Sequence, residues 1–356
     1  MCIDMKITWN PQNENEEIAF FRVTDDSNGL IIDFDYFPNS QNLWDGIQMH
    51  NFEFILLDSP YYNAESNIYE IEIDKKRERF GYVIPINALV SCEGYFTGHI
   101  KNYAFVSYWY LLSQIDKFQN NKNSLTDYFH ENLVVCVLNK ETLNRHIKDY
   151  SPDLYLLSFY EKGYYRYGQK PTKLVKGYNY ETLITTSNKI HIERGLSKCL
   201  ENEFIKNLFC NYLPYEEVAL ARFIMSYQAI EHYMSEICHA EIEQIIFDYI
   251  DKKIYKNDYF DKVSKLGGER KQISLIFERI DKSHKSITEF KRECTLLYET
   301  INYSPDKEGI ANLFYSFRNL LVHNYRILLD NEIQVSKTIQ CFELLIVHIC
   351  NNFTCS

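Results

Sequence analysis

The chain lacks the residue patterns that mark metal, nucleotide or redox chemistry. Its ten cysteines form no Cys-x-x-Cys pair, and it has no His-Glu-x-x-His cluster, P-loop or glycine-rich dinucleotide loop. Cysteines scattered through a long chain indicate reduced and mostly buried thiols rather than a disulfide framework. We therefore expect no metal site and no cofactor, and a metal hydrolase is poorly supported.

Targeting signals are also missing from the sequence pattern. The segment from Met1 to Lys6 has no basic region followed by an apolar run, as a signal peptide would. No stretch reads as long and apolar enough to span a bilayer. From these absences we expect a cytoplasmic protein with no membrane partner.

Positive charge is in deficit: 38 Lys and Arg stand against 49 Asp and Glu, which gives a formal net charge of −11. This balance excludes a generally basic nucleic-acid-binding surface, so any RNA contact must come from a local patch. The stretch from Gly309 to Leu329 contains no Asp or Glu, yet it contains Arg318, His323 and Arg326. We expect a locally positive surface there.

Two hydrophobic periods divide the chain and predict an α+β fold. The first half alternates charged and apolar residues, as half-buried strands do, and Pro85 favours an edge strand. The second half repeats apolar residues every three or four positions, as amphipathic helices do, and Gly267-Gly268 interrupts one of them. We predict a β-rich sensor or regulatory domain over 1–190 and an all-α bundle of about five helices over 195–356. The expected strands are 52–57, 68–73, 82–86, 104–109, 133–138 and 154–160, and the expected helices are 110–118, 141–148, 215–249, 286–300, 310–321 and 335–350.

One motif in the second half carries chemistry. Arg318 and His323 have the spacing Arg-x-x-x-x-His inside an apolar helical pattern, with Asn319 directly after the arginine and Tyr325 two residues after the histidine. Arginine offers a permanent charge and a planar donor fork that suits phosphate, and histidine moves protons near neutral pH. These groups are enough to cut RNA without a metal.

The same spacing occurs a second time, at Arg279 and His284, in a charged and loop-like setting. It lacks the apolar helix pattern and the polar residue after the arginine. This copy is therefore an internal control for the functional interpretation of the first.

Arg318-Asn319 followed by His323-Asn324-Tyr325 resembles the signature of the HEPN superfamily, and the helix around residues 227–233 resembles the acidic helix of its domains. The resemblance covers about residues 200–356. It implies a HEPN-like bundle and a metal-independent endoribonuclease of the bacterial toxin or anti-phage abortive-infection type. It also implies an RNA substrate, a homodimer, and an antitoxin or a phage-derived trigger as further partners.

The resemblance assigns roles to particular residues. His323 is expected to act as general base or acid, Arg318 to neutralise the transition state, and Asn319 to orient phosphate or ribose. Glu231 is expected to hold Arg318 or His323, and Tyr325 is a candidate modification target. Residues five apart on a helix point about 140° apart, so we expect a dimer whose cleft gathers Arg318 and His323 from both chains. The apolar residues Leu320, Leu321 and Val322 between them are expected to pack both the bundle core and the interface.

A non-catalytic alternative stays open. Arg318 could pair with a helix carboxylate, His323 could be a satisfied interface residue, and Tyr325 could pack. The same bundle would then be a binding or dimerisation module, for example a partner of a nucleotidyltransferase.

A second group of cations lies between the two halves. Arg166, Lys170 and Lys173 are interleaved with tyrosines, a pattern that can bind phosphates and stack bases. Together with Arg326 they are candidate nucleic-acid contacts. The alternative is a solvated strand pair or linker.

Overall fold

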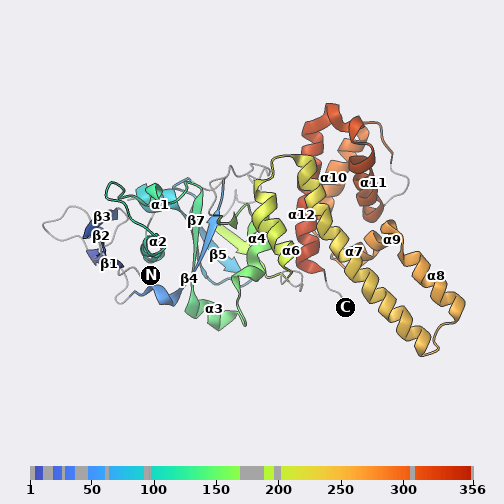
Figure 1. The fold of residues 1–356 in the computed structure, drawn as a ribbon, viewed down its shortest axis with the longest axis horizontal. Coiled ribbons are helices and arrows are strands. Elements are labelled where there is room, and N and C mark those ends of the chain that lie inside the picture. Colours follow the sequence, from blue (N-terminus) through green and yellow to red (C-terminus); the bar gives the residue numbers. More distant parts are fainter. Residues whose placement is uncertain are drawn as a thin grey trace. The chain divides into compact units, whose positions relative to one another are not determined.

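The structure, a computed structural model, describes residues 5–10, 19–25, 29–36, 47–60, 64–91, 96, 98–168, 188–195, 202–304 and 309–353. The chain divides into two compact units, Met1–Arg194 and Gly195–Ser356. The first is rich in strands and the second is all-helical, which confirms the predicted α+β class (Figure 1).

The N-terminal unit contains two sheets. A three-stranded antiparallel sheet has the order β1-β2-β3, and a six-stranded sheet has the order β8-β4-β7-β6-β5-β9. Every described pair is antiparallel except β5 with β9, which are parallel. The strands are β1 (Met5–Asn10), β2 (Ala19–Asp25), β3 (Leu30–Tyr36), β4 (Phe52–Asp58), β5 (Tyr69–Ile73), β6 (Gly81–Pro85), β7 (Leu133–Asn139), β8 (Tyr165–Arg166) and β9 (Lys189–Ile192).

The position of β6 corrects the expectation that Pro85 marks an edge. This strand pairs with β7 on one side and β5 on the other. Pro85 is the last residue of β6, where the ladder ends and a missing N–H costs least. At the other end, a Cβ on Gly81 would lie 1.9 Å from the carbonyl oxygen of Val137, so only glycine allows this close approach to β7.

Helix α2 (Ile100–Ser113) lies between the two sheets. The sequence had predicted a strand over 104–109 and a helix over 110–118 in this segment. Tyr108 of this helix stacks on Phe21 of β2 with centroids 5.4 Å apart, and Tyr103 contacts Phe52 of β4 at 5.4 Å. A helix buried on nearly all sides shows no amphipathic period, and its aromatic residues imitate a strand. The strand prediction was therefore wrong.

A strand was also predicted over 154–160, and this prediction was wrong too. Pro152 begins a 3₁₀ turn there, and helix α4 follows it until Gly163 adopts a positive φ of 80°. The remaining helical segments of this unit are η1 (Met49–Asn51), α1 (Ile86–Ser91), η2 (Leu125–Asp127), α3 (Lys140–His146), η3 (Pro152–Tyr155) and α4 (Leu156–Glu161).

The C-terminal unit is a helical bundle built around the long helix α7. This helix packs on α9 and α12, and its residues Phe223 and Tyr227 contact aromatic rings of α11. Its last turns and α8 project from the bundle (Figure 1). Its elements are α6 (Glu203–Asn207), η5 (Leu208–Tyr212), η6 (Leu213–Tyr215), α7 (Ala219–Ile250), α8 (Lys256–Leu266), α9 (Glu269–Glu278), α10 (Lys285–Thr300), α11 (Ile310–His323), η7 (Tyr325–Asn331) and α12 (Glu332–Asn352).

The core of the bundle is aromatic. Phe342 of α12 lies with its ring centroid 4.9 Å from Phe223 of α7, 5.0 Å from Phe314 and 5.9 Å from Phe317 of α11, and 5.9 Å from Phe290 of α10. Each of these rings is fully or almost fully buried. Burial of so much apolar area is the main driving force for the bundle. It also fixes which face of α11 points inward.

A buried ion pair joins α7 to α12. Arg222 donates to both carboxylate oxygens of Glu343, at 2.7 and 2.6 Å, and to the carbonyl oxygens of Leu213 and Glu216. Their side chains are 6% and 0% exposed. The fork geometry satisfies two groups that would be costly to bury alone.

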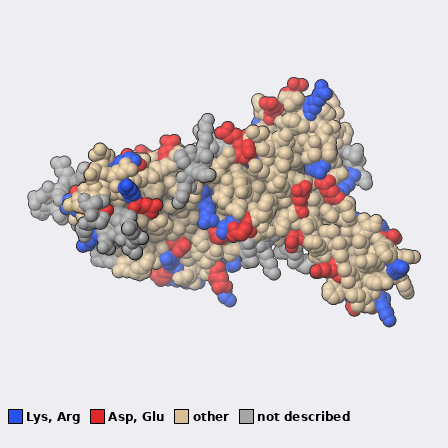
Figure 2. Space-filling model, viewed as in Figure 1, with Lys and Arg blue, Asp and Glu red and all other residues tan. Residues whose placement is uncertain are grey.

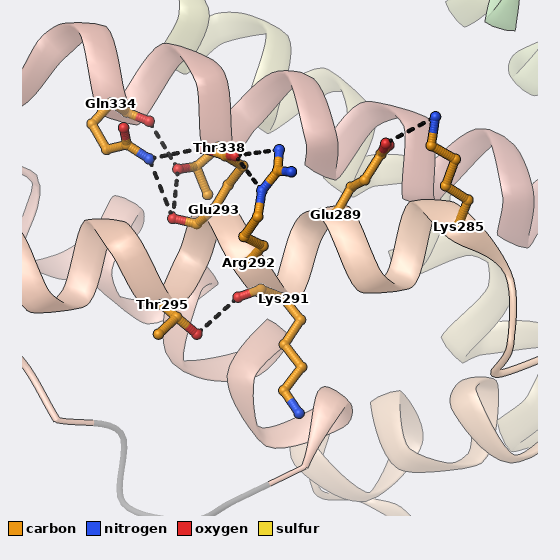
Figure 3. Close-up of polar contacts among 8 residues, drawn as sticks. All are labelled: Lys285, Glu289, Lys291, Arg292, Glu293, Thr295, Gln334 and Thr338. Atoms are coloured by element: carbon orange, nitrogen blue, oxygen red, sulfur yellow. Dashed lines mark hydrogen bonds and ion pairs between the residues drawn. The ribbon is translucent and has the colours of Figure 1, made fainter. Parts of the chain in front are cut away.

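Glu293 joins α10 to α12 in a similar way (Figure 3). One carboxylate oxygen accepts from Arg292 at 2.7 Å, and the other accepts from Gln334 of α12 at 2.9 Å. Thr338 donates to its carbonyl oxygen and to that of Gln334. Two polar contacts between facing helices thus set their register.

The segment Tyr325–Asn352, which includes α12, is long and apolar enough by length and composition to cross a membrane, contrary to the expectation from sequence. Its most apolar window is 61% buried inside the unit. A helix at the centre of a bundle is apolar on most sides, and this burial accounts for its composition.

We predict that Arg222→Ala lowers the free energy of unfolding of the helical unit by about 3–5 kcal/mol, because it leaves the Glu343 carboxylate buried and unpaired. Urea denaturation followed by far-UV circular dichroism measures this. Lys285→Ala is the control, because its ion pair with Glu289 at 3.1 Å is largely exposed and should contribute about 0.5 kcal/mol or less. Equal losses in the two variants would contradict the role given to Arg222.

Candidate active site

The motif residues lie at the C-terminal end of α11. Phe314, Phe317, Leu320 and Leu321 face the core, so Arg318, Asn319 and His323 fall on the remaining surface. The helix ends at His323, and Tyr325 begins the 3₁₀ segment η7. The motif therefore spans a helix end, with Tyr325 beyond the last residue of α11.

Arg318 and His323 contact each other within one chain. Arg318 Nη1 lies 3.0 Å from His323 Nε2, and the same nitrogen donates to Asn319 Oδ1 at 3.1 Å. A guanidinium has no lone pair, so Arg318 is the donor in this contact and His323 Nε2 is the acceptor. The expectation that the two side chains diverge was wrong, because the long arginine side chain reaches along the helix to the histidine.

A carboxylate from another helix completes the cluster. Arg318 Nε lies 3.1 Å from Glu269 Oε1 at the start of α9, and its guanidinium carbon lies 5.7 Å from the centre of the Tyr227 ring. The Nε–H itself makes no aligned hydrogen bond within the described part of the chain, so this is a charge contact. Tyr227 donates to the same Glu269 oxygen at 2.5 Å. Burial, and then Glu269, raise the pKa of Tyr227 well above its usual range.

Glu269 and Tyr227 were not found from the sequence. Glu269 belongs to another helix, and its only local signal is its place after Gly267-Gly268 at the first position of α9. The residue predicted for its role, Glu231, is exposed on α7 and makes no contact with Arg318 or His323 in the described structure. Its charge acts instead on Tyr227, one turn earlier on the same helix, where it helps to raise the pKa.

The other predicted nucleic-acid contacts do not join this cluster, and on the face shown in Figure 2 Lys and Arg are interspersed with Asp and Glu. Arg326 is exposed in η7, one turn beyond the motif. Arg166 is in β8 of the N-terminal unit, where an exposed ion pair of 3.9 Å links it to Asp153. Lys170 and Lys173 lie outside the described residues.

The second copy of the spacing has a structural role. Arg279 donates to Glu241 of α7 at 2.6 Å. His284 caps α10 by accepting from the backbone N–H of Ser286 at 3.3 Å, and its ring stacks on that of His348 at 3.8 Å. Within the described part of the chain no hydrogen bond joins Arg279 to His284, whereas Arg318 and His323 are in contact. The two copies therefore differ in geometry as well as in sequence context.

A further titratable group, Asp58, is buried in the N-terminal unit. It is 5% exposed at the end of β4, and its Oδ2 accepts from the N–H of Gly168 at 3.3 Å. Burial raises its pKa to about 7, against the opposing effect of that hydrogen bond. No sequence motif marks this residue.

No protein-family model, curated protein or solved structure matches this chain. Among the residues that the structure describes, no three His, Cys, Asp or Glu side chains are grouped so that they could hold a metal ion. The functional interpretation therefore rests on the Arg318 cluster.

The stacked histidines predict a pH dependence of stability. Burial, and then His284, lower the pKa of His348 from 6.5 to about 4. As the pH falls, the unfolded state therefore binds this proton at a higher pH than the folded state does. The stabilisation that neutral His348 gives the folded state is present above pH 6.5 and is lost as the pH falls through about 4. Acid titration of the unfolding free energy should show a weaker loss over this range in His348→Phe than in the wild type. His239→Phe, at an exposed position of α7, is the control, and an unchanged slope in His348→Phe would contradict the assignment.

Proposed function

We propose that the protein is a metal-independent endoribonuclease of the HEPN type, with Arg318 and His323 as its catalytic residues. The observation that carries the proposal is the 3.0 Å contact between Arg318 Nη1 and His323 Nε2 on one exposed helix end. A cation that binds phosphate and a neutral imidazole are thus held within reach of one phosphodiester. An anti-phage or toxin setting, cytoplasmic, is part of this proposal and rests on the motif alone.

The chemistry follows from the two groups. His323 Nε2 accepts the proton of the RNA 2′-hydroxyl, and the 2′-oxygen forms a bond to phosphorus. The bond from phosphorus to the 5′-oxygen breaks, and that oxygen takes a proton from water. The protonated His323 then returns its proton to the hydroxide so formed. Arg318 donates to the phosphate oxygens as their charge grows, and Asn319 orients the guanidinium.

Substrate binding must rearrange the hydrogen bonds of the cluster. In the structure Arg318 Nη1 occupies the lone pair of His323 that a base requires. A phosphate competes for this donor, because a charged acceptor binds a guanidinium more strongly than a neutral imidazole does. Binding of RNA thereby frees Nε2, while Glu269 keeps Arg318 at the helix end through the charge contact at Nε.

We predict that purified protein cleaves RNA in EDTA, and that His323→Ala lowers the rate by about 100-fold or more, since a general base contributes at least this much. Arg318→Lys should be similarly impaired, because an ammonium cannot contact phosphate and Asn319 with one planar fork. Gel analysis of a labelled RNA measures both rates.

The second Arg-x-x-x-x-His copy provides matched controls. Arg279→Ala and His284→Ala remove the same side-chain types from the same unit and should keep cleavage within about threefold, although loss of the cap costs about 1 kcal/mol of stability. Loss of activity in EDTA with recovery on adding a divalent ion would contradict the proposal. Inactivation by the control substitutions would show that the wrong copy was chosen.

We further propose a two-fold dimer through the apolar surface beside the motif. Leu320 and Leu321, expected to pack both the core and the interface, are buried in the core. Val322, Ile327, Leu329 and Ile333 are 48%, 53%, 51% and 77% exposed. Four exposed apolar side chains close together in sequence are typical of an association surface. The reason for proposing a dimer is now this exposed apolar surface. Divergent side chains are not a reason, because one chain already brings Arg318 and His323 together.

Ile333→Asp is predicted to convert the dimer to a monomer, because a carboxylate would be buried without a partner. Light scattering coupled to size-exclusion chromatography measures the mass. Phe247→Asp, at a 62% exposed position near the end of α7, is the control and should leave the mass unchanged. A wild-type monomer over the micromolar range would refute the dimer and leave the catalytic assignment to be judged on cleavage alone.

A further inference from the structure

Among the described residues, two arginines of the helical unit, Arg270 and Arg326, have no carboxylate partner, and Arg270 is the one held in place by another side chain. In the helical unit Arg222, Arg279, Arg292 and Arg318 each pair with a glutamate. Arg270, next to Glu269 on α9, instead donates from Nε to the amide oxygen of Asn312 at 2.7 Å. Within the described part of the chain it has no acidic partner. A cation held in place without a counter-charge indicates a site for an anion.

An aromatic ring lies against this cation. The guanidinium carbon of Arg270 is 5.5 Å from the centre of the Tyr315 ring, which is half-buried on α11. The Tyr315 hydroxyl makes no hydrogen bond among the described residues. A planar ring with an adjacent guanidinium is the combination on which unpaired nucleic-acid bases stack.

Helix geometry places Tyr315 close to the motif along α11. Successive residues of a helix are about 100° apart around its axis. Asn312, Asn319 and His323 therefore lie within about 40° of one another around the α11 axis. Tyr315 lies about 40° from Asn319, on the side towards Arg318. At 1.5 Å per residue, Tyr315 lies about 4.5 Å along the axis from Arg318 and about 12 Å from His323. α9 supplies Glu269 to Arg318 and Arg270 to Tyr315, so two adjacent residues of one helix contact both positions.

We propose that Tyr315, Arg270 and Asn312 form a base-binding subsite for single-stranded RNA, next to the phosphate that Arg318 and His323 engage. The unpaired base of a neighbouring nucleotide stacks on Tyr315, and Arg270 contacts its phosphate. Paired bases are already stacked and hydrogen-bonded, so the subsite selects single strands over duplexes. This proposal rests on the proposed function for the identity of the ligand and deepens it by naming the strand state that is recognised.

The test measures binding rather than cleavage. A fluorescent single-stranded RNA with 2′-O-methyl groups, which block attack, is titrated with the full-length protein and followed by anisotropy. Tyr315→Ala should weaken binding about tenfold, the middle of the range for loss of one aromatic–base stack. Tyr315→Phe keeps the ring and should stay within about twofold. Arg270→Ala should also weaken binding, whereas Arg279→Ala, the same charge change at a paired arginine, should not.

An RNA with one abasic position tests the subsite without altering the protein. Loss of the base that stacks on Tyr315 should weaken wild-type binding about tenfold at one position only, and it should cost nothing further in Tyr315→Ala. Unchanged binding by Tyr315→Ala and by every abasic RNA, or equal affinity for a duplex, would overturn the subsite. If unmodified RNA is cleaved in either of these cases, the proposed nuclease stands without it. If single strands bind through Tyr315 but are not cut, the subsite stands and the nuclease assignment fails.

Discussion

The buried ion pair between Arg222 and Glu343 is the interaction on which the arrangement of the helical unit depends. It lies between α7 and α12 with almost no exposure, and the guanidinium also binds two carbonyl oxygens before the start of α7. Only one register of the two helices satisfies all of these groups, because any slip leaves a charge buried alone. Tyr227 lies little more than one turn further along α7, so this register also places Tyr227 beside Glu269 and Arg318.

The candidate site is therefore the surface end of a network that begins in the core. Tyr227 is held by α7, Glu269 by the start of α9, and Arg318 by α11, and the three meet around one carboxylate. Glu269 restrains the guanidinium at Nε, and the Nη1 atom remains directed at His323. Few side-chain rotamers of Arg318 remain open, which lowers the entropy that phosphate binding must cost.

Much of the fold could be predicted from the sequence where one face of an element is buried. The alternation over residues 68–73 and the apolar stripe of α11 are examples, and both elements are present. The prediction failed for α2, because a helix between two sheets is buried all round and has no polar face to reveal its period. Burial on every side is a property of the tertiary structure, and local pattern does not report it.

The site could be predicted only as far as it lies on one helix. Arg318, Asn319 and His323 are close in sequence, and the structure brings their side chains together. Glu269 and Tyr227 come from two other helices, so their proximity depends on packing. Glu231 was predicted from the acidic pattern of α7 alone. Its carboxylate lies one turn beyond Tyr227 and does not contact Arg318 among the described residues. The direct contact between Arg318 and His323 was missed because the angle of about 140° between residues five apart describes where side chains leave the helix. It does not describe how far a long arginine side chain reaches.

The most direct measurement of the central claim compares two RNAs that differ by one oxygen atom. One is all-ribose, and the other has a single 2′-deoxynucleotide on the 5′ side of the main cleavage position. If the 2′-oxygen attacks phosphorus with His323 as base, the wild-type protein in EDTA should cut the first RNA to a 2′,3′-cyclic phosphate and leave the second intact at that position. Equal cleavage of the two RNAs, or products that end in a 3′-hydroxyl, would contradict the account.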